Sequence, residues 1–307
     1  MKIVFFGSSG FSVLPLRSIA SLTPYVVTKK AKPKGRGYTL DDNEVKKAAI
    51  EMGLPLLEIE TFKDEAVWGD LARLEPQLYV VASFGLIFPK WALDIPSIGA
   101  INIHPSLLPK YRGPSPIQWA ILNGEENTGV TIMKIVEKMD AGNIVYQEPA
   151  AINKDDNFVT LSERLSRRAS EILPQIIDSI GLHGMMEGIQ QKNEKATYTP
   201  IITKEMGKIN WNRKAIEIVN QIKAFTAWPT AYALLDEITI KIFDGEVYVL
   251  NRNEMPGTIV EKTREGFVVA TTDGSILIKE VQMENRKKMS ACEFANGYRG
   301  LIGKISK

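Results

Sequence analysis

Residues 78–104, LYVVASFGLIFPKWALDIPSIGAINIH, contain two short apolar runs, LYVVAS (78–83) and AINI (100–103). Such short, continuously apolar runs predict strands that are buried on both faces of a sheet. Runs of the same kind come earlier in the chain: KIVFF (2–6), YVVT (25–28) and LPLLE (54–58). Patterns typical of helices lie between them, for example at 43–52 and 62–73. This alternation predicts an α/β, Rossmann-like domain with a mostly parallel sheet.

The next two apolar runs, TGVTIMKIV (128–136) and NIVYQEPAAI (143–152), are joined by the short turn EKMDAG. A connection this short favours an antiparallel pair, because parallel strands need a long crossover. We therefore expect these two strands to close the sheet, and a long helix to follow at about 158–181.

Residues 190–207 are polar, lack a helical period and contain Pro200, which predicts a linker. After a short helix at about 212–224, strand-like runs recur between turn residues: TAYALL (230–235), ITIKIF (238–243), EVYVLN (246–251), GTIVEK (257–262), FVVATT (267–272) and SILIKEV (275–281). This pattern predicts a smaller, OB-like β-barrel. We expect a first domain at 1–189, the linker at 190–207 and the barrel at 208–307.

The bulk composition excludes several classes of protein. The 307 residues include one cysteine, so neither an intramolecular disulfide framework nor a Cys-rich zinc site is expected. A formal net charge of +2 does not point to a particular partner. The apolar start of the chain is too short for a signal peptide, and no run approaches the roughly 20 apolar residues of a membrane span. We expect a cytoplasmic, monomeric protein without membrane contact.

Two polar residues interrupt the end of the strand at 100–103. Asn102 and His104 are two positions apart, so their side chains share one face of the strand. The carboxyl ends of parallel strands are where open α/β sheets bind ligands. An amide and an imidazole together can stabilise an oxyanion and transfer a proton. Neither is a good nucleophile here, so the attacking atom would come from a substrate.

A carboxylate that orients the imidazole would complete such a site, and Asp140 in the turn EKMDAG is the best candidate. Gly142 is expected to permit an unusual backbone angle in this turn. A single histidine at a strand end is also a common structural residue, and Asp-Ala-Gly is ordinary turn chemistry. From spacing alone, the catalytic and the structural interpretations stay open.

The segments NIHPSLLPKYRGPSPIQWAI (102–121) and TGVTIMKIVEKMDAGNIV (128–145) resemble the folate-dependent formyltransferases, whose hallmark is Asn-x-His-Pro-Ser-Leu-Leu-Pro with a later Asp-x-Gly. The resemblance implies that 10-formyltetrahydrofolate donates a formyl group to a primary amine without a metal. It assigns oxyanion stabilisation to Asn102, acid–base catalysis to His104 and orientation of the imidazole to Asp140. It also implies a folate site formed by Ser106, Leu107, Leu108, Pro109, Phe84, Leu86 and Ile87.

Further segments resemble the methionyl-tRNA formyltransferase branch of this family, including FFGSSGFS (5–12), KGRG (34–37) and PGTIV (256–260). This likeness covers nearly the whole chain and implies that methionyl initiator tRNA is the acceptor. It also implies a catalytic first domain and a C-terminal barrel that binds tRNA. Residues 28–37 contain no acidic residue and are expected to form a basic surface loop, which in this context fits contacts with phosphates. Its basic residues are Lys29, Lys30, Lys32, Lys34 and Arg36.

Three other interpretations compete with this one. A sugar-nucleotide N-formyltransferase would use the same centre but has no use for the basic segment. A non-catalytic RNA-binding protein would leave Asn102, His104 and Asp140 without a role. A nicotinamide dehydrogenase is disfavoured because Gly7-Ser8-Ser9-Gly10 lacks the glycine spacing of the dinucleotide fingerprint.

Overall fold

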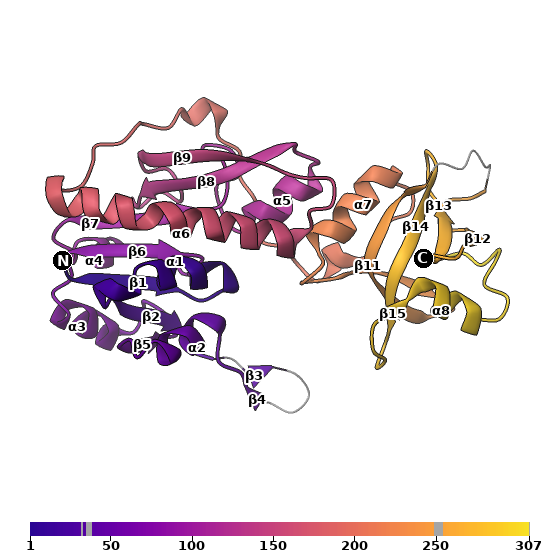
Figure 1. The fold of residues 1–307 in the computed structure, drawn as a ribbon, viewed down its shortest axis with the longest axis horizontal. Helices are drawn as coiled ribbons and strands as arrows, with labels where there is room; N and C mark the ends of the chain where they lie inside the picture. The colour runs from indigo at the N-terminus through magenta and orange to yellow at the C-terminus, as the bar shows by residue number, and fades with distance from the viewer. Residues whose placement is uncertain (32, 35–38, 249–253, 307) are drawn as a thin grey trace. The chain divides into compact units, whose positions relative to one another are not determined.

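A computed structural model describes residues 1–31, 33–34, 39–248 and 254–306 (Figure 1). The chain divides into two compact units. The first comprises residues 1–116, 127–151 and 162–199, and the second comprises 117–126, 152–161 and 200–307. The predicted domain boundaries, with a linker at 190–207, remain a prediction.

The first unit is built on a seven-stranded sheet in the order β5-β2-β1-β6-β7-β8-β9. The strands are β1 Ile3–Gly7, β2 Tyr25–Lys29, β5 Leu56–Ile59, β6 Leu78–Ala82, β7 Gly99–His104, β8 Asn127–Lys134 and β9 Ile144–Ala151. The five strands from β5 to β7 are parallel, whereas β8 and β9 pair antiparallel. All residues of β1 and β6 are buried, as their apolar sequences require. The predicted α/β fold and the antiparallel pair are confirmed.

Helices accompany this sheet: α1 Val13–Ser18, α2 Glu44–Glu51, α3 Glu65–Arg73, α4 Lys90–Leu93 and α6 Phe158–His183, the last of which runs across both units. Side-chain N-caps determine where two of these helices, α2 and α3, begin. The Asn43 side chain accepts a hydrogen bond from the Lys46 amide before α2, and the Asp64 side chain accepts one from the Ala66 amide before α3. These caps explain why α2 and α3 begin slightly later than their patterns predict.

The segment expected to be a basic surface loop at 28–37 is partly strand. Thr28 and Lys29 belong to β2, and Thr28 is fully buried. A small hairpin follows, in which β3 Pro33–Lys34 pairs with β4 Thr39–Leu40. The loop interpretation was therefore wrong for these positions.

An aromatic cluster fixes the chain where it leaves β6. The Phe6 ring lies 4.8 Å from the ring of Tyr79, 5.0 Å from that of Phe88 and 5.3 Å from that of Phe84, in edge-to-face geometry. Such pairs stabilise a core beyond the burial of their area. The 83–89 connection is thus held firmly at the carboxyl end of the parallel strands.

The second unit is an antiparallel β domain with helices. Its strands are β10 Ala231–Leu235, β11 Ile238–Tyr248, β12 Ile259–Lys262, β13 Phe267–Ala270, β14 Ser275–Met283 and β15 Met289–Ser290. The sheet order is β10-β11-β14-β13-β12, and β15 pairs with β14. Its helices are α7 Ala215–Ala224, α8 Ala291–Gly297 and most of α5 Pro116–Leu122. Strands, α7 and α8 surround one apolar core, which agrees with the predicted barrel-like domain.

One part of this β domain differs from the expectation. Residues 238–243 and 246–251 were predicted as separate strands, but β11 continues through Asp244-Gly245. The pairing register with β14 shifts on both sides of Asp244, so this dipeptide forms a bulge within the strand and not a turn. Residues 249–251 lie outside the described part of the chain. The short helix α8 was not predicted.

Candidate active site

Strand β7 ends with Asn102 and His104. In the sheet, Asn102 lies between Val81 of β6 and Met133 of β8, and His104 lies beside Thr131 of β8. His104 is only 4% exposed, whereas Asn102 is half-buried. Asn102 is thus paired with strands on both sides, whereas His104, the last residue of β7, is paired with β8.

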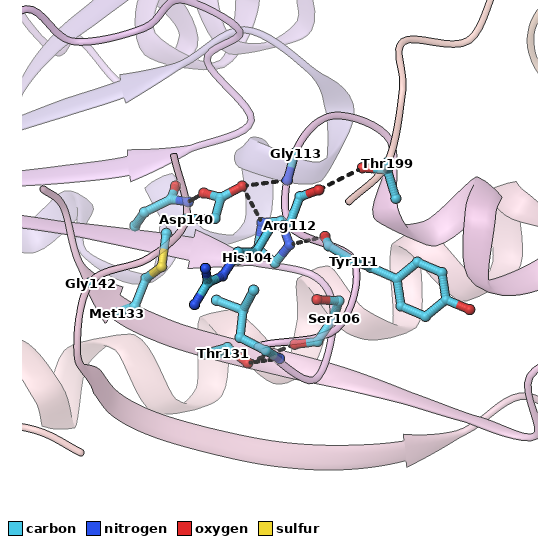
Figure 2. A network of polar contacts seen from close by, with 12 residues as sticks. His104, Ser106, Tyr111, Arg112, Gly113, Thr131, Met133, Asp140, Gly142 and Thr199 are labelled. Atoms are coloured by element: carbon cyan, nitrogen blue, oxygen red, sulfur yellow. Dashed lines mark hydrogen bonds and ion pairs between the residues drawn. The ribbon is translucent and has the colours of Figure 1, made fainter. Parts of the chain in front are cut away.

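The connection between β8 and β9 folds back so that Asp140 reaches this pair (Figure 2). One carboxylate oxygen of Asp140 accepts a long hydrogen bond of 3.5 Å from the Asn102 amide. The other oxygen lies 3.7 Å from Nδ1 of His104 and accepts a 2.8 Å hydrogen bond from the Gly113 amide. The three predicted catalytic side chains therefore form a single cluster.

The backbone of this connection corrects one expectation. Asp140, not Gly142, adopts the left-handed conformation, with φ at 48°. Asp tolerates this region better than most residues that carry a Cβ. Gly142 is needed for a different reason, since a Cβ there would lie 1.9 Å from the carbonyl oxygen of Lys134. The glycine permits a close approach of two backbone segments.

The His104 ring lies between two acceptors. Its Nε2 is 2.8 Å from the carbonyl oxygen of Tyr111, and its Nδ1 faces the Asp140 carboxylate. A neutral imidazole can donate to one of them, whereas an imidazolium can donate to both. The arrangement can therefore hold a proton that has been taken from a substrate.

The loop after His104 is braced against β8. The Thr131 hydroxyl donates to the Ser106 carbonyl at 2.6 Å, and the Leu108 amide lies 3.3 Å from the same hydroxyl. The Ser106 hydroxyl in turn donates to the Lys110 carbonyl at 2.8 Å. These contacts give the Pro-rich loop a defined shape before any ligand binds.

The predicted folate residues differ in their accessibility. Ser106, Leu108 and Phe84 have buried side chains, so their side chains face the protein. Leu107, Pro109 and Leu86 are half-buried, and Ile87 is 72% exposed. Because Ala82 pairs with Ile103, the loops that carry these residues leave the same edge of the sheet. Leu86 and Ile87 also line a pocket with Phe62 of the β5–α3 connection, Trp68 of α3 and Trp91 of α4.

The predicted basic segment begins with Lys29 of β2, a strand that is separated from β7 by β1 and β6 in the sheet. The Lys29 ammonium donates to the Gly85 carbonyl at 3.2 Å, and Lys30 is exposed just beyond β2. Lys34 contributes its backbone to β3, and its side chain is not described. Lys32 and Arg36 lie outside the described residues.

Sequence reasoning missed the segment 191–199, which it interpreted as linker. The Arg112 amide donates to the Thr197 carbonyl at 2.9 Å. The Thr199 amide and hydroxyl donate to the Arg112 carbonyl at 2.8 and 3.0 Å, and Figure 2 shows this Arg112–Thr199 contact. Gln191 is 5% exposed and contacts the turn that carries Asp140. The available signal was Arg112 itself, a charged residue in a Pro- and Gly-rich loop beside the predicted site.

In the described part of the chain, no group of three or more His, Cys, Asp or Glu side chains is arranged to hold a metal ion. Nor does any helix within those residues have the length and apolarity to cross a membrane.

Comparison with known proteins identifies the family. Residues 1–177 match the formyl transferase family, and residues 201–299 match the formyl transferase C-terminal domain. A methionyl-tRNA formyltransferase of Thermodesulfovibrio yellowstonii is 42% identical over 301 residues, which cover 96% of this chain and 95% of that protein. Another from Staphylococcus aureus is 38% identical over 307 residues, covering 99% and 98%.

The fold is also similar to a crystal structure of an N-formyltransferase from Helicobacter canadensis in complex with folinic acid and dTDP-3-aminofucose. The TM-score is 0.66 at 22% identity, and the match covers 92% of this chain and 99% of the other. That likeness concerns the fold, whereas the two more similar sequences match along nearly their whole length. The chain belongs to the methionyl-tRNA formyltransferase family.

Proposed function

We propose that this protein transfers the formyl group of 10-formyltetrahydrofolate to the α-amino group of methionyl initiator tRNA, with Asn102, His104 and Asp140 as catalytic residues. The observation that carries this assignment is the position of the Asp140 carboxylate. It lies 3.5 Å from the Asn102 amide and 3.7 Å from the His104 ring, at the end of an interior strand. Family membership supports the donor and the acceptor.

The donor supplies a formyl carbon that is already bonded to a nitrogen leaving group. The substrate amine forms a new bond to that carbon, the bond between the carbon and N10 of the folate breaks, and the proton lost by the amine ends on N10. The chain must therefore stabilise a developing oxyanion and move one proton.

The geometry of the cluster suits these two tasks. One N–H of the Asn102 amide is directed at Asp140, which leaves the second N–H for the oxyanion. Because Nε2 of His104 donates to the Tyr111 carbonyl, Nδ1 is the ring nitrogen that can take the proton of the attacking amine. Asp140 then stabilises the imidazolium and holds its orientation, because the Gly113 amide fixes the carboxylate at 2.8 Å.

For the folate we propose that Leu86, Ile87, Leu107 and Pro109 contact the ligand with their side chains. Their partly open apolar surfaces fit a flat ring system. Phe84, Ser106 and Leu108 would act through the loop shape that their buried side chains impose. We further propose that the basic segment 29–36 and the domain at 208–307 bind tRNA, and that the protein works as a cytoplasmic monomer. The exposed Lys30 and the half-buried Lys29 support a cationic surface there.

The function is tested by comparing two acceptors in separate reactions. Purified protein is offered 10-formyltetrahydrofolate with either methionyl initiator tRNA or a 4-amino sugar nucleotide, and the formylated product is identified by mass spectrometry. We expect formylation of the tRNA. Formylation of the sugar nucleotide alone would refute the proposal, and His104→Ala measured in parallel shows whether any product depends on the cluster.

A further inference from the structure

The turn that carries Asp140 is held by a side chain that no step of the proposed chemistry uses. The Gln191 amide nitrogen donates to the carbonyl oxygen of Asp140 at 2.9 Å and to that of Gly142 at 2.7 Å. An amide nitrogen has two N–H groups, so both are used on this one turn. Gln191 therefore fixes the backbone on both sides of Ala141.

Arg112 holds the opposite end of the same side chain. The Gln191 side-chain oxygen accepts from Nε of Arg112 at 3.1 Å and from Nη2 at 2.8 Å. The guanidinium also donates to Asn193 at 3.0 Å and to the Tyr198 hydroxyl at 3.3 Å. Every hydrogen-bonding group of the Gln191 amide is thus engaged.

The environment of Arg112 is unusual for a buried charge. Its side chain is fully buried, and among the described residues it meets neutral oxygens and the Tyr198 ring but no carboxylate. Burying an unpaired cation is costly, and apolar residues often fill such a place with equal or better stability. The two bonds from Arg112 orient the Gln191 amide, so that its nitrogen faces the two carbonyls of the turn.

The Asp140 turn needs such a restraint. Asp140 is left-handed at φ 48°, and left-handed backbone persists at a non-glycine residue when the surroundings enforce it. The Asp140 carboxylate accepts one short bond, from the Gly113 amide at 2.8 Å, whereas its contacts of 3.5 and 3.7 Å to Asn102 and His104 are long. The Gly113 bond holds the side chain, and the two bonds from Gln191 hold the backbone of the turn.

We propose that Gln191 and Arg112 are positioning residues for the formyl transfer, which hold the Asp140 carboxylate against His104 and Asn102. The inference rests on the proposed function of this cluster. Misplacing a catalytic group by about 1 Å can cost about 10²-fold in rate. Loss of the Gln191 donors should therefore lower kcat and leave the KM values for folate and tRNA nearly unchanged.

The decisive variant is Gln191→Glu. A carboxylate keeps the length of the side chain and gives Arg112 an ion-pair partner, so the buried cation stays satisfied. It replaces both N–H donors with oxygen lone pairs that face the carbonyls of Asp140 and Gly142. We expect kcat to fall between about tenfold and about 10²-fold. Gln191→Met, which has neither donor nor charge, serves as the second variant and should show the same fall.

Asn193→Asp is the matched control. It also places a carboxylate on Arg112, at the position where Asn193 now accepts at 3.0 Å, but Asn193 does not contact the Asp140 turn. We expect its kcat to stay within about twofold of wild type. Melting temperatures and circular dichroism of all variants show whether each one is folded.

A double-mutant cycle tests whether Gln191 acts through Asp140. In an Asp140→Asn background, Gln191→Glu should cause little further loss, because the group that it positions is already disabled. The inference is overturned if both Gln191 variants keep the wild-type kcat or change only KM. It is also overturned if kcat falls equally in Asn193→Asp, or if the effects of Gln191→Glu and Asp140→Asn are fully additive. If the wild-type protein does not formylate methionyl-tRNA, the proposed function fails first, which is a separate outcome.

Discussion

Replacing Asp140 with Asn removes one negative charge and almost no volume. The carboxylate oxygen that accepts from the Gly113 amide at 2.8 Å would be replaced by the amide oxygen, which can keep this bond. The new amide nitrogen would then face the side-chain nitrogen of Asn102. Both groups are donors, so the hydrogen bond between these two side chains would be lost. The variant should therefore fold while losing the charge beside His104 and disturbing the orientation of Asn102.

The distance sets the size of the effect. At the observed 3.7 Å between His104 Nδ1 and the Asp140 carboxylate, two unit charges attract by about 4 kcal/mol at an effective dielectric constant of about 20. The side chains are only 5% and 13% exposed, so water screens this attraction incompletely. If the ring becomes cationic as it takes the proton, this energy stabilises the transition state. About 1.4 kcal/mol corresponds to a tenfold change, so kcat should fall by about 10²–10³.

The assay is the rate of methionyl-tRNA formylation at saturating folate and tRNA, with the KM of each substrate measured separately. Asp155→Asn is the charge-matched control, because Asp155 is exposed and belongs to the second unit, whereas the cluster belongs to the first. A kcat for Asp140→Asn within threefold of wild type would refute the electrostatic role. Weak folate binding with unchanged chemistry at saturation would instead make Asp140 a ligand contact.

Three further predictions follow from the same structure. Asn102→Ala should lower kcat by about 10²–10³ through loss of one oxyanion donor, and His104→Ala by about 10²–10⁴, with unchanged circular dichroism; normal turnover in both would contradict the mechanism. Neutralising Lys29, Lys30, Lys32, Lys34 and Arg36 together should flatten the salt dependence of tRNA affinity by roughly one slope unit per lost phosphate contact, so superimposable curves would remove this segment from tRNA binding. In the second unit, hydrogen bonds from Lys304 and Tyr298 hold the pKa of the Asp236 carboxyl below its usual value, so this stabilisation is present at neutral pH and is lost as the pH falls through the folded-state pKa. Asp236→Asn should therefore lower the melting temperature at pH 7 but not at a pH well below about 4, and a difference independent of pH would argue against the effect.

The sequence by itself determined the elements whose signals are local. Apolar runs such as 78–83 and 100–103 specified buried strands, because a strand covered on both faces has no polar side to display. The two-residue spacing of Asn102 and His104 was enough to place both side chains on one face. The family likeness of 102–121 and 128–145 covered the loops on either side of the site.

Contacts between distant positions were decided only by the tertiary structure. Asp140 meets Asn102 across 38 positions, and Gln191 meets Arg112 across 79. No periodicity encodes such meetings, because they depend on how β8 registers with β7 and how the 135–143 connection folds back over the sheet. Gly142 shows the same limit. A side chain at position 142 is excluded by the carbonyl oxygen of Lys134, which lies close to Gly142 only when β8 and β9 have paired.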